Sequence, residues 1–485
     1  MTYTPKRTYC VLGLMLAGAI ALRAQEASSN AITFAKIAGF NGTEGGYPSA
    51  SLVQATDGNL YGTVFSGGAS DDGTVIRMTP SGKVTTLYSF CSQSGCTDGQ
   101  NPAAPLIQAS DGNLYGTTEY GGSTGYGTVF RITLSGGLTT LYSFCIQGGC
   151  PDGSHPQAGL VQASDGNLYG AAGSTLFKIT LGGAMTTIGS SGGFGVLGSL
   201  IQASDGNLYG TNWGGGPQCC GGTIFQLTTS GTVTMLYNFC IPSGCPDGQF
   251  PESSLIEAAD GNLYGTTTFG GAHGGGTVFK IPVGGGTLTQ IYNFCAQSSC
   301  SDGEYPFAGL IQATDSNFYG VTSAGGAPST CEPFSRCGTV FQLTTSGTLT
   351  TLHQFCAQAS CLDGEFPFAG LTQATNGNIY GTTEFGGTSL ACAYSCGTVY
   401  TLLTGLGPFV ETQPSFGAVG AQINILGSRL SDTTTVSFDG TPAFFKIISS
   451  TEIQAIVPAG ATTGPVTVTV HSKTLNSNVN FQVVP

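Results

Sequence analysis

The sequence predicts an all-β fold, a seven-bladed β-propeller with four-stranded blades followed by an immunoglobulin-like β-sandwich. Three observations predict it. One motif recurs seven times between residues 52 and 381, each copy lies among short β-type segments, and the repeats stop near residue 405, where a different β-type sequence begins. Glycine is abundant (78 of 485 residues) and charged residues make up 8%, which suits short strands and tight turns and excludes coiled coils and disordered polyanions.

Residues 1–24 have the features of a secretory signal peptide. Two basic residues precede an apolar run from Cys10 to Leu22, and the small residue Ala24 precedes polar sequence. This run is too short to span a bilayer, and no later stretch reaches about 20 apolar residues. We therefore expect no membrane span and a secreted or extracellular surface protein, with the periplasm as an alternative. Because neither a cleavage-site cysteine nor a hydrophobic tail is present, we expect free release or non-covalent attachment.

The complete repeats contain four strand segments, as residues 106–144 illustrate. The first, LIQA, alternates apolar and polar residues and leads through an Asp-Gly hairpin into the second, NLYGTT. A glycine-rich loop of variable length follows, then GTVFRIT, a Ser-Gly turn and LTTLYSF. Four antiparallel strands repeated about every 50 residues are typical of a propeller blade, whereas the rungs of a parallel β-helix, the structural alternative, are shorter.

The two ends of the repeat region complement each other. The seventh repeat stops after residues 397–403 and lacks its fourth strand, whereas residues 31–40 form an orphan strand that is similar to LTTLYSF. We expect these two segments to complete one blade and close the ring over residues 31–405. The third repeat is 14 residues shorter than its neighbours, so the ring should be notched there.

The segment 408–485 follows a short linker and has different strand patterns. AQINILG, TVSFDG, EIQAIVP and GPVTVTV are separated by Gly and Pro turns, which suits a small β-sandwich.

Both regions resemble known families. In QASDGNLYGTT followed by GTVF and LYSF, the repeats resemble the GloVer tandem repeat of secreted proteins from acidobacteria, verrucomicrobia and similar bacteria. That resemblance implies an exported protein, often tethered through a C-terminal anchor that this chain lacks, and implies no established activity. In GAVGAQINILGSRL, VSFDGTPA and IQAIVPAGATTGPVTVTV, the C-terminal segment resembles an IPT/TIG domain, which implies an immunoglobulin-like spacer or interaction module.

The cysteines fall into local pairs. An even number of closely paired cysteines in an exported protein indicates disulfides, and pairs that lie one repeat apart do not converge as a zinc site requires. We assign no state to the adjacent Cys219 and Cys220, because a bond between neighbours strains the peptide. The predicted pairs are Cys91 with Cys96, Cys145 with Cys150, Cys240 with Cys245, Cys295 with Cys300, Cys331 with Cys337, Cys356 with Cys361, and Cys392 with Cys396.

The charge balance limits the partners. Without residues 1–24 the chain keeps 10 basic and 26 acidic residues, a formal charge of −16. This excludes nucleic acid and anionic membranes. We interpret the negative balance as keeping a glycine-rich surface soluble, not as steering a cationic ligand.

The acidic residues and histidines predict no metal site and no cofactor. The first repeated set lies in the Asp-Gly hairpins, where a carboxylate satisfies backbone donors and Asn376 serves the same turn. The second set follows the cysteine pairs with one carboxylate per loop, too few for calcium. The sets are Asp57, Asp111, Asp165, Asp205, Asp260 and Asp315, and Asp98, Asp152, Asp247, Asp302 and Asp363. Three histidines at unlike repeat positions, His155, His273 and His353, form no zinc or hydrolase triad.

Two residue patterns are candidates for function. Glu119 and Glu384 share one repeat position and form a candidate carboxylate pair for glycoside cleavage, although we interpret them as solvated loop glutamates. An aromatic residue precedes Gly-Gly in four variable loops, and we place all four on one face of the disk. Exposed aromatic side chains there would stack on sugar rings or anchor a partner protein. The alternative, which we favour, is that each one packs its own loop against the blade. These residues are Tyr120, Trp213, Phe269 and Phe385.

We therefore expect a secreted, monomeric, non-enzymatic binding or adhesion protein that presents its loops to a polysaccharide or a cell-surface protein. One alternative is a carbohydrate-active enzyme with its site in the propeller funnel, which requires acids that converge at one end of the channel. The other is a purely structural cell-envelope protein.

Overall fold

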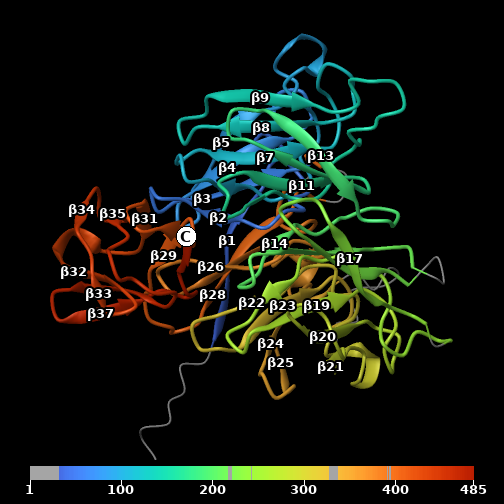
Figure 1. The fold of residues 1–485 in the computed structure, drawn as a ribbon. Coiled ribbons are helices and arrows are strands. Elements are labelled where there is room, and N and C mark those ends of the chain that lie inside the picture. Colours follow the sequence, from blue (N-terminus) through green and yellow to red (C-terminus); the bar gives the residue numbers. More distant parts are fainter. Residues whose placement is uncertain are drawn as a thin grey trace, which may run out of the picture.

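The computed structural model describes residues 32–216, 221–241, 243–326, 337–389, 391–392 and 395–484. The predicted signal peptide and the pair Cys219 and Cys220 lie outside these ranges. Within them the chain forms seven four-stranded antiparallel sheets arranged as blades, followed by a C-terminal β-domain (Figure 1). The predicted propeller and immunoglobulin-like domain are confirmed. No helix in the described part of the chain is long and apolar enough to cross a membrane.

Blades 1 to 6 each use four consecutive strands, with a two-residue strand at the inner edge. Their bounds are β2 (Val53–Gln54), β3 (Leu60–Val64), β4 (Thr74–Met78) and β5 (Val84–Ser89); β6 (Ile107–Gln108), β7 (Leu114–Thr118), β8 (Thr128–Ile132) and β9 (Leu138–Ser143); β10 (Val161–Gln162), β11 (Leu168–Ala172), β12 (Thr175–Ile179) and β13 (Met185–Ser190); β14 (Ile201–Gln202), β15 (Leu208–Asn212), β16 (Thr223–Leu227) and β17 (Val233–Asn238); β18 (Ile256–Glu257), β19 (Asn262–Thr267), β20 (Thr277–Pro282) and β21 (Thr289–Asn293); β22 (Ile311–Gln312), β23 (Phe318–Thr322), β24 (Thr339–Leu343) and β25 (Leu349–Gln354).

Blade 7 joins the two ends of the repeat region. It contains β26 (Thr372–Gln373), β27 (Ile379–Thr383) and β28 (Thr398–Leu403), and its fourth strand is β1 (Thr33–Gly39). β1 runs antiparallel to β28, with Thr33 opposite Leu403 and Gly39 opposite Thr398. The expected closure of the last blade by the N-terminal strand is confirmed.

The repeated motif builds both the hairpins and the core. In blade 1 the Asp57 carboxylate accepts hydrogen bonds from the Asn59 amide at 3.0 Å and the Tyr61 hydroxyl at 2.8 Å. The Tyr61 ring is fully buried, and its cluster joins Phe90 of blade 1 to Phe130 of blade 2. The hydrophobic core therefore lies between blades, which explains why the same residues recur in each repeat.

A ring of side chains, which we call the glutamine ring, connects the inner strands. Each member accepts a hydrogen bond from a backbone N–H of the preceding blade, at 2.7 to 3.0 Å. The bond from Thr375 to Gln54 completes the circle between blades 7 and 1. The members are Gln54, Gln108, Gln162, Gln202, Glu257, Gln312 and Gln373.

The cysteine loops are locally cross-linked. Within the described residues six predicted disulfides form: Cys91–Cys96, Cys145–Cys150, Cys240–Cys245, Cys295–Cys300, Cys356–Cys361 and Cys392–Cys396. Cys331 lies outside these residues. Short 3-10 turns close three of the loops, η1 (Ser94–Cys96), η2 (Ser298–Cys300) and η4 (Ala359–Cys361). The buried Asp98 accepts hydrogen bonds from the Tyr88 hydroxyl and the Ser92 amide, which agrees with a structural role for this acidic set.

The C-terminal domain pairs two four-stranded sheets over one core. One sheet contains β29 (Glu411–Gln413), β31 (Gln422–Leu426), β35 (Glu452–Ile456) and β34 (Phe445–Ile447). The other contains β33 (Thr441–Pro442), β32 (Thr433–Phe438), β36 (Val466–Val470) and β37 (Lys473–Asn476). The turn η5 (Leu430–Asp432) precedes β32, and β30 (Phe416–Ala418) lies parallel to β38 (Gln482–Val484).

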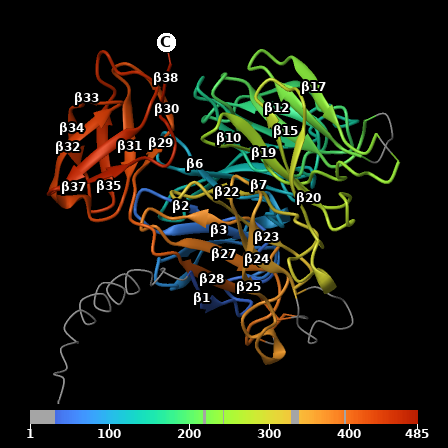
Figure 2. The ribbon, with the colours of Figure 1, turned by 90° about the horizontal axis from the view of Figure 1, so that it is seen from below.

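This domain contacts the propeller at the Asp-Gly hairpin of blade 1 and the Asn-Gly hairpin of blade 7 (Figure 2). The Thr451 hydroxyl donates to the carbonyl oxygen of Thr56 at 2.9 Å, and the Phe409 amide donates to that of Thr375 at 3.1 Å. The Gln413 side-chain amide donates to the carbonyl oxygen of Gln54 at 3.3 Å. The domain therefore covers part of the propeller end at which the glutamine ring lies.

Candidate functional site at the channel mouth

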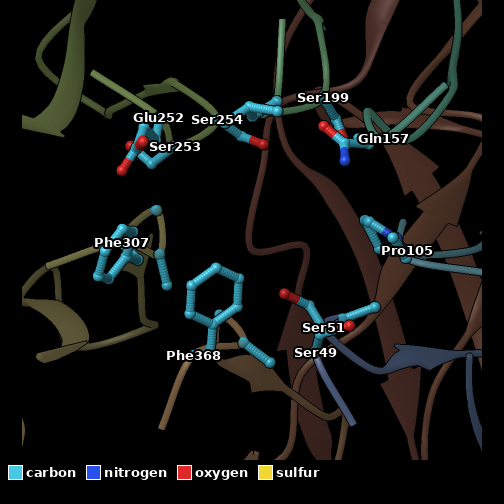
Figure 3. A pocket seen from close by; sticks show the side chains of 18 of the residues that line it. Ser49, Ser51, Pro105, Gln157, Ser199, Glu252, Ser253, Ser254, Phe307 and Phe368 are labelled. Carbon is cyan, nitrogen blue, oxygen red and sulfur yellow. The ribbon is translucent and has the colours of Figure 1, made fainter. Parts of the chain in front are cut away.

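A pocket of about 480 Å³ lies on the propeller axis, at the end of the inner strands opposite the glutamine ring (Figure 3). All seven blades contribute to it from the same repeat position, three residues before the repeated Leu that precedes the first strand. The residues at this position differ from blade to blade: Ser49, Ala103, Gln157, Leu197, Glu252, Phe307 and Phe368. Because the position varies while its surroundings repeat, it gives the channel mouth its chemical character.

A tight turn before each of these residues places them at the axis. In six blades the residue that precedes the turn proline has a left-handed backbone, with φ between 50° and 65°. This conformation is uncommon for residues other than glycine, so each turn is held by its contacts. In blade 2, for example, the Asn101 amide donates to Asp72 and its carbonyl accepts from Glu119. The six residues are Tyr47, Asn101, His155, Phe250, Tyr305 and Phe366.

One wall of the pocket is aromatic. The half-buried rings of Phe307 and Phe368 lie with centroids 5.0 Å apart and planes inclined by 35°. Phe366, which does not line the pocket, stacks on Phe368 with ring centroids 5.9 Å apart. Figure 3 shows Phe307 and Phe368 together on one wall, with Glu252 next to Phe307 and Gln157 across the cavity.

The rest of the lining combines small apolar residues with polar and acidic ones. The buried Glu119 accepts a hydrogen bond from the Gln157 amide at 2.9 Å, and Glu252 accepts one from the Thr268 hydroxyl at 2.6 Å. Burial raises the pKa of the Glu252 carboxyl above its ordinary value, although the Thr268 hydrogen bond opposes this shift. Glu384 also lines the pocket, and no described Lys, Arg or His residue does. The site is therefore an acidic cavity with one aromatic side.

The four aromatic residues predicted from the loops lie around this pocket but do not line it. Tyr120, which is 40% exposed, packs edge-on against His155 of the next blade at 4.9 Å. Phe269 lies between Phe250 at 5.9 Å and Tyr305 at 4.8 Å. These side chains connect neighbouring blades, so their loops are stabilised across the blade boundary.

Phe385 and Trp213 have similar surroundings, but Trp213 occupies a different repeat position. Phe385 lies between Tyr47 at 5.5 Å and Phe366 at 5.7 Å. The backbone amide of Trp213 donates to the carbonyl oxygen of Gly195. The amide of Glu119 makes the same bond to the carbonyl oxygen of Asn101, so Trp213 is equivalent to Glu119 and not to Tyr120. The extra glycine after Trp213 made the four loops look alike in the sequence.

The sequence singled out two of the pocket glutamates and missed the third. Glu119 and Glu384, the candidate carboxylate pair interpreted as solvated loop glutamates, line one cavity together with Glu252, and Glu119 is buried instead of solvated. Glu252, Phe307 and Phe368 have one sequence signal, which is their variation directly after the turn proline. Convergence of all seven blades on one axis is what turns this variable position into a site.

In the described part of the chain, the groups of three potential metal ligands all include disulfide-bonded cysteines. They are Asp72 with Cys91 and Cys96, Glu304 with Cys295 and Cys300, and Glu365 with Cys356 and Cys361. A cysteine ligates zinc only as a thiolate, which a disulfide does not offer. The pocket glutamates are not among these groups, so three of their oxygens do not approach one point.

Comparison with known proteins identifies both regions. The model of the Gloeobacter/Verrucomicrobia repeat matches residues 25–193 and 172–400, and that of the IPT/TIG domain matches residues 410–483. No curated protein matches the sequence. Virginiamycin B lyase from Staphylococcus aureus is similar in structure, with 14% identity and a TM-score of 0.50 over 76% of this chain and 99% of the lyase. A fungal alcohol oxidase of the AA5 family in complex with copper has 13% identity and a TM-score of 0.53 over 94% of this chain and 100% of the oxidase. At such identities the likeness shows the fold alone.

Proposed function

The chain belongs to the Gloeobacter/Verrucomicrobia repeat family, and from the pocket on its propeller axis we propose that it is a secreted, non-enzymatic protein that binds carbohydrate at the channel mouth. The observation that carries this proposal is the pairing of an aromatic wall with a polar wall in one cavity. A volume of about 480 Å³ is within the range of small-ligand sites.

Sugar rings fit both walls. Their C–H faces are apolar and pack on aromatic rings, which Phe307 and Phe368 offer. Their hydroxyl groups donate to carboxylates and accept from amides, which Glu252, Glu119 and Gln157 supply. The hydroxyl oxygen of Ser49, on the same cavity, is shielded from solvent and lacks a hydrogen-bond partner among the described residues, so a polar ligand group can satisfy it.

The C-terminal IPT/TIG domain contacts the opposite end of the inner strands and leaves the channel mouth open. We propose that it serves as a spacer or docking module that holds the propeller away from the surface to which it attaches. The repeat family, the IPT/TIG domain and the disulfides fit an extracellular protein and support export.

A glycan array tests this proposal. The purified mature protein is compared with a Phe307→Ala/Phe368→Ala variant and with Tyr120→Ala, a matched control on the same face that does not line the pocket. We expect the double variant to lose at least about tenfold in affinity, and the control to bind like the parent protein. The proposal fails if the parent protein binds no glycan, or if binding survives in the double variant.

One observation favours a second candidate, a carbohydrate-active enzyme. Glu119, Glu252 and Glu384 converge on the pocket, as a glycoside hydrolase in the funnel would require, and the raised pKa of Glu252 suits a general acid. New reducing ends after incubation with bound glycans, abolished by Glu252→Gln, would replace the binding proposal with this one. A purely structural protein predicts neither binding nor turnover.

A further inference from the structure

We infer that the channel-mouth pocket selects ligands that carry protonated amines, such as oligomers of de-N-acetylated amino sugars, through the carboxylates of Glu119, Glu252 and Glu384. This inference rests on the proposed function and names the ligand class of the same site.

The three glutamates surround the axis. Glu119 follows β7 of blade 2, Glu384 follows β27 of blade 7, and Glu252 precedes β18 of blade 5. Blades 2 and 7 flank blade 1, and blade 5 lies across the ring from it. A ligand on the axis therefore has a carboxylate on several sides.

The described residues that line the cavity include three glutamates but no Lys, Arg or His. Glu119 and Glu252 receive hydrogen bonds from a neutral amide and a neutral hydroxyl, which orient the carboxylates without cancelling their charge. A recessed site with charge of one sign focuses its potential, so it attracts cationic groups and repels anionic ones.

The aromatic wall favours the same class of ligand. Phe307 lies beside Glu252 and packs against Phe368, and the face of an aromatic ring attracts an ammonium group. A neutral sugar can use this wall for packing, but only a cationic one uses both the ring faces and the carboxylate charge.

A metal ion fits the arrangement less well than an extended organic cation. A bound calcium ion needs oxygens at about 2.3–2.6 Å on several sides. Three ligand atoms within 4.8 Å of one another occur, among the described residues, beside the disulfides and not at the pocket glutamates. An oligomer with an amine on each ring can reach separate carboxylates, because its charges are themselves separated.

Calorimetric titration with three tetrasaccharides of similar length tests the inference: glucosamine, N-acetylglucosamine and glucose oligomers, all β-1,4-linked. We expect the parent protein to bind the glucosamine oligomer at least about tenfold more tightly than the other two. The Glu119→Gln/Glu252→Gln/Glu384→Gln variant should lose this preference, so that the three oligomers bind to it with similar affinities. The control variant, Glu44→Gln/Glu257→Gln/Glu452→Gln, loses the same amount of charge outside the pocket. Its glutamine at position 257 is the residue that the other six blades carry in the glutamine ring. This control should keep the preference for the glucosamine oligomer.

The outcomes separate the two proposals. Equal affinity for all three oligomers, or loss of the preference in the control variant, overturns the amine selectivity and leaves carbohydrate binding in place. Binding of no oligomer by the parent protein overturns this inference, and an array without any bound glycan overturns the proposed function as well.

Discussion

Replacing Gln54 with alanine tests whether burial or the number of hydrogen bonds decides how much a member of the glutamine ring contributes to stability. Gln54 accepts from the Thr375 amide at 2.8 Å and donates to the Gly58 carbonyl at 3.1 Å. Gln162 makes three such bonds, at 2.9 to 3.0 Å, with Ser110 and Gly166. Thr375 is fully buried, whereas Ser110 is exposed.

The two interpretations give opposite rankings. Loss of the Gln54 side chain leaves a buried N–H without an acceptor, which costs about 1–3 kcal/mol, and removes a second bond worth about 1 kcal/mol. At Ser110 water takes the place of Gln162, so we expect a cost of about 1 kcal/mol or less. With an unfolding entropy of about 2.1 cal/mol/K per residue over a propeller of roughly 370 residues, Tm should fall by about 3–5 °C for Gln54→Ala and about 1 °C for Gln162→Ala.

Differential scanning calorimetry measures both shifts. Fluorescence of Trp213, the only tryptophan in the sequence, follows unfolding in urea as an independent probe. Unchanged far-ultraviolet circular dichroism is the control for the native fold. A Gln162→Ala variant that loses as much stability as Gln54→Ala would refute the reasoning from burial.

Three further predictions concern the loops, the pocket and the C-terminal domain. The first replaces the four loop aromatics Tyr120, Trp213, Phe269 and Phe385 with alanine. We expect the free energy of unfolding, measured in urea, to fall by at least about 4 kcal/mol, while the folded variant keeps the glycan affinity of the parent protein. A variant that stays stable but no longer binds glycan would contradict this. Burial raises the pKa of Glu252, and a bound ammonium group lowers it. In calorimetric titrations the affinity for the glucosamine oligomer should therefore fall as pH drops through the raised pKa, while the affinity for the glucose oligomer changes little. Parallel pH profiles for the two oligomers would count against this assignment. Burial raises the pKa of Glu411 to about 7, so its contribution to stability is fully present below pH 4.5 and is lost as pH rises through 7. Glu411→Gln should therefore be more stable than the parent protein at pH 8 by about 1–3 kcal/mol and similar at pH 4.5, and denaturant curves that differ equally at both pH values would contradict this.

The fold could be predicted because its determinants repeat. Tyr61 and its six equivalents fill the space between blades, and Asp57 and its equivalents form the hairpins, so each repeat specifies the same unit. The strand that closes the ring was also visible, because the last repeat lacks the strand that the N-terminal segment supplies.

The site could not be predicted in the same way, because it lies where the repeats differ. Phe307, Phe368 and Glu252 are single variable residues about one repeat apart, and the sequence contains no sign that they share one cavity. Trp213 shows why matching residue types did not align this loop correctly. Three glycines follow Trp213 where two follow the other aromatics, so only its backbone hydrogen bond shows which repeat position it occupies.

The pairing of β1 with β28 has a consequence for the order of folding. β1 is synthesised before the other strands of the ring, yet its partner lies in the seventh repeat, with Thr33 opposite Leu403. The earliest strand must therefore wait unpaired while six blades assemble, and joining the chain ends is a late, entropically slow step. A chain that ends within the seventh repeat would expose β1 and its neighbours as open strand edges, so we expect it to aggregate instead of forming a six-bladed ring.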